Sequence, residues 1–244
     1  MSEPRNDEPR NAEPRNDELP PSAERDGLRT IVCFGDSNTY GWDPELGATG
    51  GRLGRDARWP GVLRRELGPG YDVIEEGLGG RTAGVDDPYN EFRDAREQIL
   101  PILWSHAPVD LVAIMLGTND LKETFHPSAV NIARAANYLV ELAVRSLAGP
   151  GDTPPHVLLI APAPLGPATS IQESSGFLAG IEESQRLGRL YREVAESFGV
   201  AFLDAGEVAS VSPLDGVHLD ATACRALGLA VAAIVRQIFE TPGA

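Results

Sequence analysis

The stretch IVCFGDSNTYGW, residues 31 to 42, is an apolar run that breaks abruptly into small polar residues. A short continuous apolar run is typical of a parallel-sheet strand that is buried on both faces. Ser37 follows this run where a tight turn needs a small residue, and where a reactive hydroxyl would also be presented. The local sequence therefore leaves two interpretations of Ser37 open, a turn residue or a nucleophile.

Outward from this stretch, short apolar runs alternate with longer amphipathic ones. We expect strands at 30–34, 71–76, 109–116, 156–161 and 200–204. We expect helices at 59–67, 91–106, 128–148, 177–198 and 221–239. This alternation is typical of βαβ units, and it predicts an α/β fold, a three-layer α/β/α sandwich around a flavodoxin-like five-stranded parallel sheet. Ligands of such folds bind beyond the carboxyl ends of the strands.

The N-terminal segment differs in composition from the rest of the chain. Residues 3–17 repeat the pattern EPRND, EPRNA, EPRND, and the segment lacks aromatic and β-branched residues up to Gly27. Such a composition cannot bury enough apolar surface to order the chain. We therefore expect a disordered tail over 1–27 and one globular domain over 28–244, a common size for one α/β domain.

Charge and cysteine content limit the partners and the location. The net charge is −15, which argues against nucleic acid and anionic membrane surfaces as partners, because both attract clustered Lys and Arg. The charged N-terminus has no apolar secretory segment, and no run approaches the roughly 20 apolar residues of a membrane span, so we expect a cytoplasmic protein. Cys33 and Cys224 lie in apolar patterns and are predicted to be buried thiols rather than a disulfide framework.

Small and polar residues gather after each expected strand. The segments are GDSNT (35–39), GLGGRT (77–82), GTND (117–120), PAPLGP (162–167) and, in the last loop, DGVHLD (215–220). The carboxyl ends of parallel strands meet at one edge of a sheet, so these segments are expected to lie close together.

A serine nucleophile needs an imidazole to accept its proton and a carboxylate to hold that imidazole in the correct tautomer. Three of the four histidines occupy common structural settings, namely His106, His126 and His156. His218 follows Asp215 by three residues in a turn-rich loop, so both side chains can reach one face of a turn. An Asp-x-x-His pair alone is weak evidence, because helix N-caps such as Asp220 look similar.

Ester hydrolysis also needs donors for the developing oxyanion. Asn119 offers a carboxamide after the third strand, and Gly80 has no side chain to keep its amide from a substrate. Each feature has an ordinary alternative, since Gly79 and Gly80 also suit a plain turn and Asn119 also suits a helix cap.

Together, GDSNT, GLGGRT, GTND and DGVHLD resemble, in order and spacing, the four signature blocks of the SGNH (GDSL) hydrolase superfamily over about residues 30 to 240. The resemblance implies a catalytic triad of Ser37, Asp215 and His218. It implies an oxyanion hole of the Ser37 amide, Gly80 and Asn119. It also implies a serine hydrolase that needs no metal or organic cofactor.

Further segments, GWDP (41–44), DLVAIMLGTND (110–120) and FLDAGEV (202–208), resemble the bacterial arylesterase/acyltransferase branch. This branch hydrolyses short-chain and aryl esters, and some members pass the acyl group to alcohols or hydrogen peroxide. The resemblance implies a small-molecule ester substrate, a homo-oligomer, and a narrow acyl pocket shaped by Trp42, Thr118 and Val217. Asn38 replaces the leucine of the GDSL motif and is expected to place a polar group near that pocket. Gly79 and Gly80 stand where the branch often has Ser-Ala.

Alternatives from other classes remain at this point. A flavodoxin-like module would use GDSNTYG to cradle a phosphate or flavin. A metal phosphoesterase would use Asp36, Asn119, Asp120 and His218 as ligands, and an inactive SGNH-like domain would only bind acylated ligands.

Two further features of the sequence each have two interpretations. Arg81 is expected either to orient a polar substrate or to pair with Asp86 or Asp87. The loop 43–58 is expected either to overhang the site or contact another subunit, or to be a plain surface loop.

Overall fold

The computed structural model describes residues 27–47 and 51–240. The predicted tail over 1–27 therefore lies outside the described residues except for Gly27, as do residues 48–50 of the loop 43–58 and residues 241–244.

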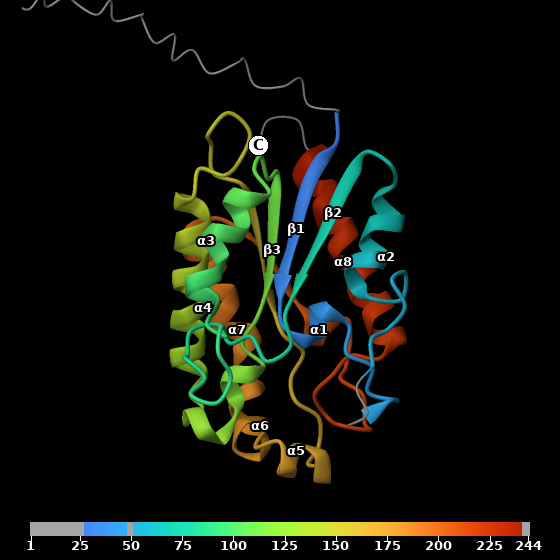
Figure 1. Cartoon of the computed structure of the whole chain (residues 1–244), viewed down its shortest axis with the longest axis vertical. Helices are drawn as coiled ribbons and strands as arrows, with labels where there is room; N and C mark the ends of the chain where they lie inside the picture. The colour runs from blue at the N-terminus through green and yellow to red at the C-terminus, as the bar shows by residue number, and fades with distance from the viewer. Residues whose placement is uncertain (1–26, 48–50, 241–244) are drawn as a thin grey trace, which may run out of the picture.

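The described residues form five strands and eight α-helices, joined by short 3₁₀ turns (Figure 1). The strands are β1 (Arg29–Gly35), β2 (Tyr71–Gly77), β3 (Leu111–Met115), β4 (His156–Ala161) and β5 (Ala201–Asp204). The helices are α1 (Ser37–Tyr40), α2 (Trp59–Leu67), α3 (Ala95–Ser105), α4 (Ala129–Arg145), α5 (Ser170–Ser174), α6 (Ile181–Ser184), α7 (Leu187–Phe198) and α8 (Ala221–Glu240). The 3₁₀ turns are η2 (Asn119–Leu121), η3 (Glu123–Phe125), η4 (Leu178–Gly180) and η5 (Ala205–Glu207).

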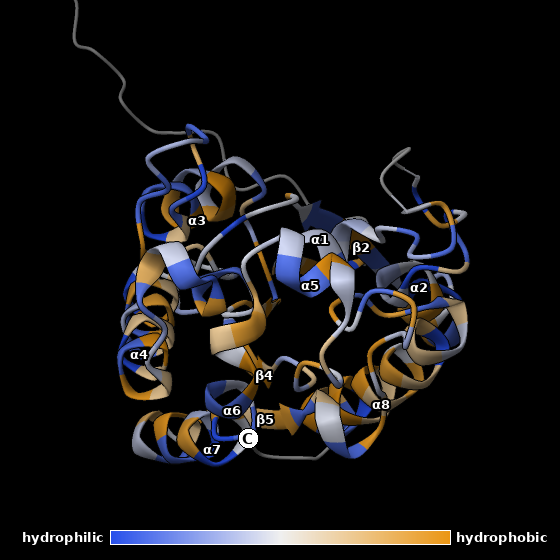
Figure 2. Ribbon diagram, turned by 90° about the horizontal axis from the view of Figure 1, so that it is seen from below, coloured by the Kyte–Doolittle hydropathy of each residue, from blue (hydrophilic) through white to orange (hydrophobic). Residues whose placement is uncertain are grey.

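The strands form one parallel sheet in the order β2-β1-β3-β4-β5. Helices α3, α4 and α7 lie on one side of the sheet, and α2 and α8 lie on the other (Figures 1 and 2). This arrangement confirms the predicted α/β sandwich. The chain order reverses between β1 and β3, so the carboxyl ends of these two strands flank the crevice where such sheets bind ligands.

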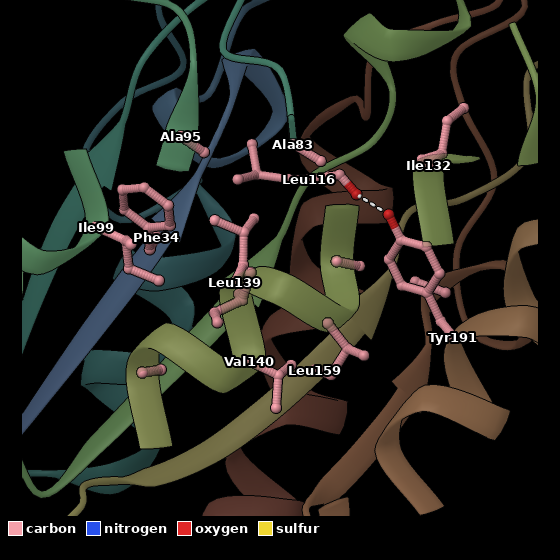
Figure 3. Close-up of a cluster of buried hydrophobic side chains, with 14 of the residues drawn as sticks. Phe34, Ala83, Ala95, Ile99, Leu116, Ile132, Leu139, Val140, Leu159 and Tyr191 are labelled. Carbon is pink, nitrogen blue, oxygen red and sulfur yellow. Dashed lines mark hydrogen bonds between the residues drawn. The ribbon is translucent and has the colours of Figure 1, made fainter. Parts of the chain in front are cut away.

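Each face of the sheet is covered by its own hydrophobic core. In β1, Val32 and Phe34 face α3, α4 and α7, whereas Ile31 and Cys33 face α2 and α8. Burial on both faces explains why the strand is apolar without alternation. Figure 3 shows the first core, in which the Tyr191 hydroxyl on α7 donates a hydrogen bond of 2.9 Å to the carbonyl of Leu116.

Two expected helices differ from the structure. The helix expected over 91–106 begins at Ala95, because the side chain of Asp94 caps it by accepting the amide of Arg96. The stretch expected as one helix over 177–198 is divided into η4, α6 and α7. At the end of η4, Gly180 packs directly on the backbone of Leu121, where a Cβ would lie 2.4 Å from the Leu121 carbonyl oxygen.

The last helix, α8, and the two cysteines can be compared with the predictions on membrane spans and buried thiols. Among the described residues, α8 alone is long and apolar enough, by length and composition, to cross a membrane. The expectation that no segment reaches those criteria was therefore wrong, although one face of α8 packs in the core beneath the sheet, as helices of globular domains do. Cys33 and Cys224 are both buried and free, as predicted.

Candidate active site

Ser37 is the first residue of α1 and lies at the crevice between β1 and β3. Asp36 ends the turn after β1 and caps α1, accepting the amide of Asn38 at 2.9 Å. Gly41 ends the helix in the left-handed conformation, with φ of 84°, which glycine adopts without strain. This one-turn helix holds the hydroxyl of Ser37 at the carboxyl edge of the sheet.

His218 lies beside Ser37, although 181 residues separate them in the sequence. Its Nε2 is 3.0 Å from the Ser37 Oγ, and its Nδ1 is 2.7 Å from the Asp215 Oδ2. An ionised carboxylate only accepts hydrogen bonds, so the imidazole hydrogen lies on Nδ1 and Nε2 is the acceptor for the serine proton. The three residues that the sequence singled out therefore form one continuous hydrogen-bonded chain.

The carboxyl group of Asp215 is held in its ionised form. Burial by itself would raise its pKa, but the hydrogen bond from the His218 ring and those from the amides of His218 and Val217 outweigh burial and lower the pKa. A carboxylate in this state stabilises an imidazolium at His218.

Three groups at the crevice are placed to donate to an oxyanion. Among the described residues, the backbone amides of Ser37 and Gly80 donate to no other group. Gly80 has φ of 80°, in the region that favours glycine. The Asn119 carboxamide donates to the Arg81 carbonyl at 3.1 Å and to the Asp36 Oδ2 at a long 3.5 Å. The weaker of these two bonds can be exchanged for a bond to a substrate oxygen.

Two buried carboxyl groups lie beneath these donors. Burial raises the pKa of Asp36 to about 6, partly offset by the Asn38 amide, His218 and Arg81. Burial likewise raises the pKa of Asp120 to about 6, although its carboxyl oxygens accept the amides of Ala83 and Gly84. Because Asp120 follows Asn119 directly, these two bonds tie the segment after Gly80 to the loop that carries Asn119.

A pocket of about 390 Å³ opens at this crevice. It is lined by Ser37, Trp42, Gly79, Gly80, Asn119, Lys122, Ser175, Phe177 and His218. The indole of Trp42 lies 5.7 Å from the His218 ring, centre to centre. A larger hollow of about 570 Å³ lies between α4 and α7, away from this site. Neither Ser37 nor His218 lines it.

Sequence reasoning missed several of the lining residues. Lys122 lies one turn after Asn119, so the spacing between the two residues could have indicated that Lys122 also faces the pocket. Burial lowers the pKa of Lys122, while Asp87, Asp36 and Asp120 oppose the shift. Ser175 and Phe177 follow α5 in a segment with no motif, and only the folded chain brings them to the pocket.

Three residues predicted to touch the substrate do not line this pocket. Asn38 is buried and directs its side chain to the backbone of the His218 loop rather than to the pocket. Val217 is buried, and its carbonyl oxygen accepts the hydrogen bond from Nδ2 of Asn38. Thr118 is buried, and its carbonyl accepts the Leu121 amide that closes η2.

Neither expectation for Arg81 holds. Its guanidinium is buried and donates to the carbonyl oxygens of Gly35 and Glu76, at the ends of β1 and β2, and to Gln98. Arg81 therefore supports the floor of the site instead of meeting a substrate or a neighbouring aspartate.

The loop 43–58 is tied back to the sheet. Arg52 donates to the Tyr40 carbonyl at 2.7 Å, and both Arg52 and Arg58 pair with Glu75 on β2. None of the described residues of this loop lines the pocket.

The residues considered for a metal phosphoesterase are used in other ways. Both carboxyl oxygens of Asp120 accept backbone amides, and both ring nitrogens of His218 face Ser37 and Asp215. In the described ranges, no group of three or more His, Cys, Asp or Glu side chains is arranged to hold a metal ion.

Comparison with known proteins identifies the family. Residues 33–226 match the model of the GDSL-like lipase/acylhydrolase family. A carbohydrate acetylesterase from Sinorhizobium meliloti is 39% identical, with a TM-score of 0.82 over 86% of this chain and 100% of that chain. The aryl esterase of M. smegmatis is 40% identical, with a TM-score of 0.81 over 86% of this chain and 99% of that chain. A search of the curated proteins finds no match. The chain belongs to the GDSL-like lipase/acylhydrolase family, on the arylesterase branch of the SGNH hydrolases.

Proposed function

We propose that this protein is a serine esterase that hydrolyses short-chain, acetyl-type or aryl esters through an acyl-enzyme. The observation that carries the proposal is the hydrogen-bonded chain from Asp215 through His218 to Ser37, which ends in an open pocket. This arrangement supplies a base for a hydroxyl that is otherwise a weak nucleophile.

In the acylation step, Nε2 of His218 accepts the Ser37 proton while Oγ forms a bond to the ester carbonyl carbon. The carbonyl oxygen gains the negative charge and is met by the amides of Ser37 and Gly80 and by the Asn119 carboxamide. The protonated His218 then passes its proton to the alcohol oxygen as the carbon–oxygen bond breaks. Asp215 stays ionised and stabilises the imidazolium throughout.

Deacylation repeats these steps with water. His218 removes a proton from water, the hydroxyl attacks the acyl carbon, and the Ser37 oxygen leaves with the proton from His218. An alcohol or hydrogen peroxide in place of water would give acyl transfer or perhydrolysis, which we propose as a secondary activity.

The size and walls of the pocket support a small acyl group. A volume of about 390 Å³ lies at the lower end of the range for ligand pockets, and the flat walls of Trp42 and Phe177 suit an acetyl or aryl group. The two similar solved structures are described as a carbohydrate acetylesterase and an aryl esterase, which supports the same substrate class. A flavodoxin-like module is not favoured, because it would leave the bond between His218 and Asp215 without a role.

The test combines p-nitrophenyl acetate hydrolysis with fluorophosphonate labelling. Wild-type protein should be labelled once, and Ser37→Ala should lose the label and at least about a thousandfold in kcat. Ser174→Ala is the control, because the Ser174 hydroxyl is bonded to the Ile171 carbonyl and should keep both properties. An unlabelled wild type, or undiminished turnover in Ser37→Ala, would refute the proposal.

A series of p-nitrophenyl esters of increasing acyl length tests the size of the pocket, and acetate should be hydrolysed faster than the esters with long acyl chains. Self-association and a cytoplasmic location stay predictions.

A further inference from the structure

Asn38 connects the one-turn helix of the nucleophile to the loop of the general base. Its Oδ1 accepts the amide of Leu219 at 2.9 Å, and its Nδ2 donates to the carbonyl of Val217 at 3.4 Å. These are the two residues on either side of His218. We propose that Asn38 is a positioning residue that sets the place of His218 relative to Ser37, an inference that rests on the proposed function.

The chemistry of a carboxamide suits this contact. Its donor and its acceptor lie in one plane, so a single side chain satisfies a carbonyl and an amide two residues apart on the facing backbone. Both bonds are buried, where an unpaired backbone group costs the most. The leucine of the GDSL motif has neither group, so it could not make this connection.

Asn38 is itself rigidly held. Its own amide is bonded to the Asp36 carboxyl group, and it directly follows Ser37 in α1. A short, fixed path therefore runs from the Ser37 backbone through the Asn38 side chain to both neighbours of His218.

The Asp215 end of the loop that carries His218 is held by residues at the start of α5. The Thr169 hydroxyl donates to the Asp215 carbonyl at 3.1 Å, and the Gln172 carboxamide donates to the Gly216 carbonyl at 2.9 Å. These bonds place Asp215 but do not reach α1. Removal of the Asn38 side chain would therefore leave the pair of Asp215 and His218 intact, and would loosen the distance from His218 to Ser37.

This placement predicts which kinetic constant changes. Asn38 does not line the pocket, so substrate binding should be preserved and kcat should fall. A misplaced imidazole is a poor base and a poor acid. An alkyl alcohol leaves only with a proton from His218, whereas p-nitrophenolate leaves without one, so kcat/KM should fall more for ethyl acetate than for p-nitrophenyl acetate.

The experiment compares Asn38→Ala with Ser146→Ala, both normalised to the fraction of sites that a fluorophosphonate labels. Ser146 is buried away from the site, and its hydroxyl also makes two bonds to backbone, to the Ala143 carbonyl and from the Ala148 amide. Loss of either side chain should lower Tm. Only Asn38→Ala should lose about 10- to 100-fold in kcat per labelled site, with KM within about twofold of wild type and a greater loss for ethyl acetate.

A second variant covers the case in which Asn38→Ala does not fold. Asn38→Asp keeps the acceptor for Leu219 and loses the donor to Val217. We expect a smaller loss of kcat per labelled site than in Asn38→Ala, because one of the two bonds to the loop of His218 is kept.

The outcomes separate the two proposals. If wild-type protein neither hydrolyses these esters nor takes the label, the proposed function fails. If wild type is active but the Asn38 variants keep its kcat per labelled site and its ratio between the two esters, Asn38 has only a structural role and the inference is overturned.

Discussion

The Oδ2 of Asp215 lies 2.7 Å from Nδ1 of His218, while its Oδ1 accepts the backbone amides of Val217 and His218. The two oxygens of one carboxyl group therefore have different tasks, one to hold the loop and one to set the imidazole tautomer.

Asp215→Asn should separate these tasks. The amide oxygen can still accept the two backbone bonds, but the new NH₂ group would face Nδ1 and favour the tautomer with its hydrogen on Nε2, toward Ser37. We expect kcat for p-nitrophenyl acetate to fall by roughly 10⁴, with Tm close to that of wild type. A variant that keeps wild-type kcat would show that the tautomer is not set by Asp215.

Asn119→Ala should test the oxyanion donors. Loss of one such donor typically raises the barrier by about 2.7 to 4 kcal/mol, so kcat should fall roughly 10²- to 10³-fold with little change in KM. Asn131→Ala, which changes an exposed asparagine on α4, is the control and should behave as wild type. An effect confined to KM would place Asn119 in ground-state binding instead.

The buried Asp36 predicts a specific dependence of stability on pH. Its pKa is about 6 in the folded protein, above the ordinary value of 3.8, so the folded state binds this proton more tightly than the unfolded state. Its contribution to the free energy of unfolding is therefore full below about pH 4 and is lost as pH rises through 6, by roughly 3 kcal/mol in all.

Urea denaturation from pH 4 to 8 measures this contribution. Asp36→Asn keeps an acceptor for the Asn38 amide and cannot ionise, so its stability relative to wild type should increase as pH rises from 4 to 6 and then stay constant. Parallel curves for the two proteins would contradict the assignment.

The position of Lys122 predicts that the enzyme prefers esters with a negatively charged acyl group. It lines the pocket, with its ammonium 5.6 Å from the centre of the Phe177 ring. Lys122→Gln should lower the ratio of kcat/KM for p-nitrophenyl hemisuccinate to that for p-nitrophenyl butyrate by about three- to tenfold, because a partly screened charge pair is worth about 1 kcal/mol. Lys122→Arg should keep the ratio, and added salt should reduce the difference. An unchanged ratio in Lys122→Gln would mean that the ammonium does not face the acyl group.

Much of this architecture was predictable because strands and helices leave periodic signals. The continuous apolar run before Ser37 reports a strand buried on both faces, and the structure places that strand within the sheet. The spacing from Asp215 to His218 showed that both side chains can reach one face of a turn, but it was weak evidence by itself. Their pairing with Ser37 followed from the resemblance of the four motifs to the SGNH hydrolases. By contrast, the single helix expected over 177–198 is divided into η4, α6 and α7, and Gly180 at the end of η4 packs on Leu121, which comes from a distant part of the chain.

The sequence by itself determined the order of strands and helices and the residues that form the hydrogen-bonded chain, because those depend on local periodicity and on motifs at strand ends. Only the tertiary structure decided where individual side chains point. Asn38 was expected at the pocket and instead holds Val217 and Leu219. Arg81 was expected to meet either a substrate or a neighbouring aspartate, and it instead supports the ends of β1 and β2. The physical reason is that a polar side chain takes the direction of the partner that satisfies it, and for Asn38 that partner lies 179 residues away in the sequence.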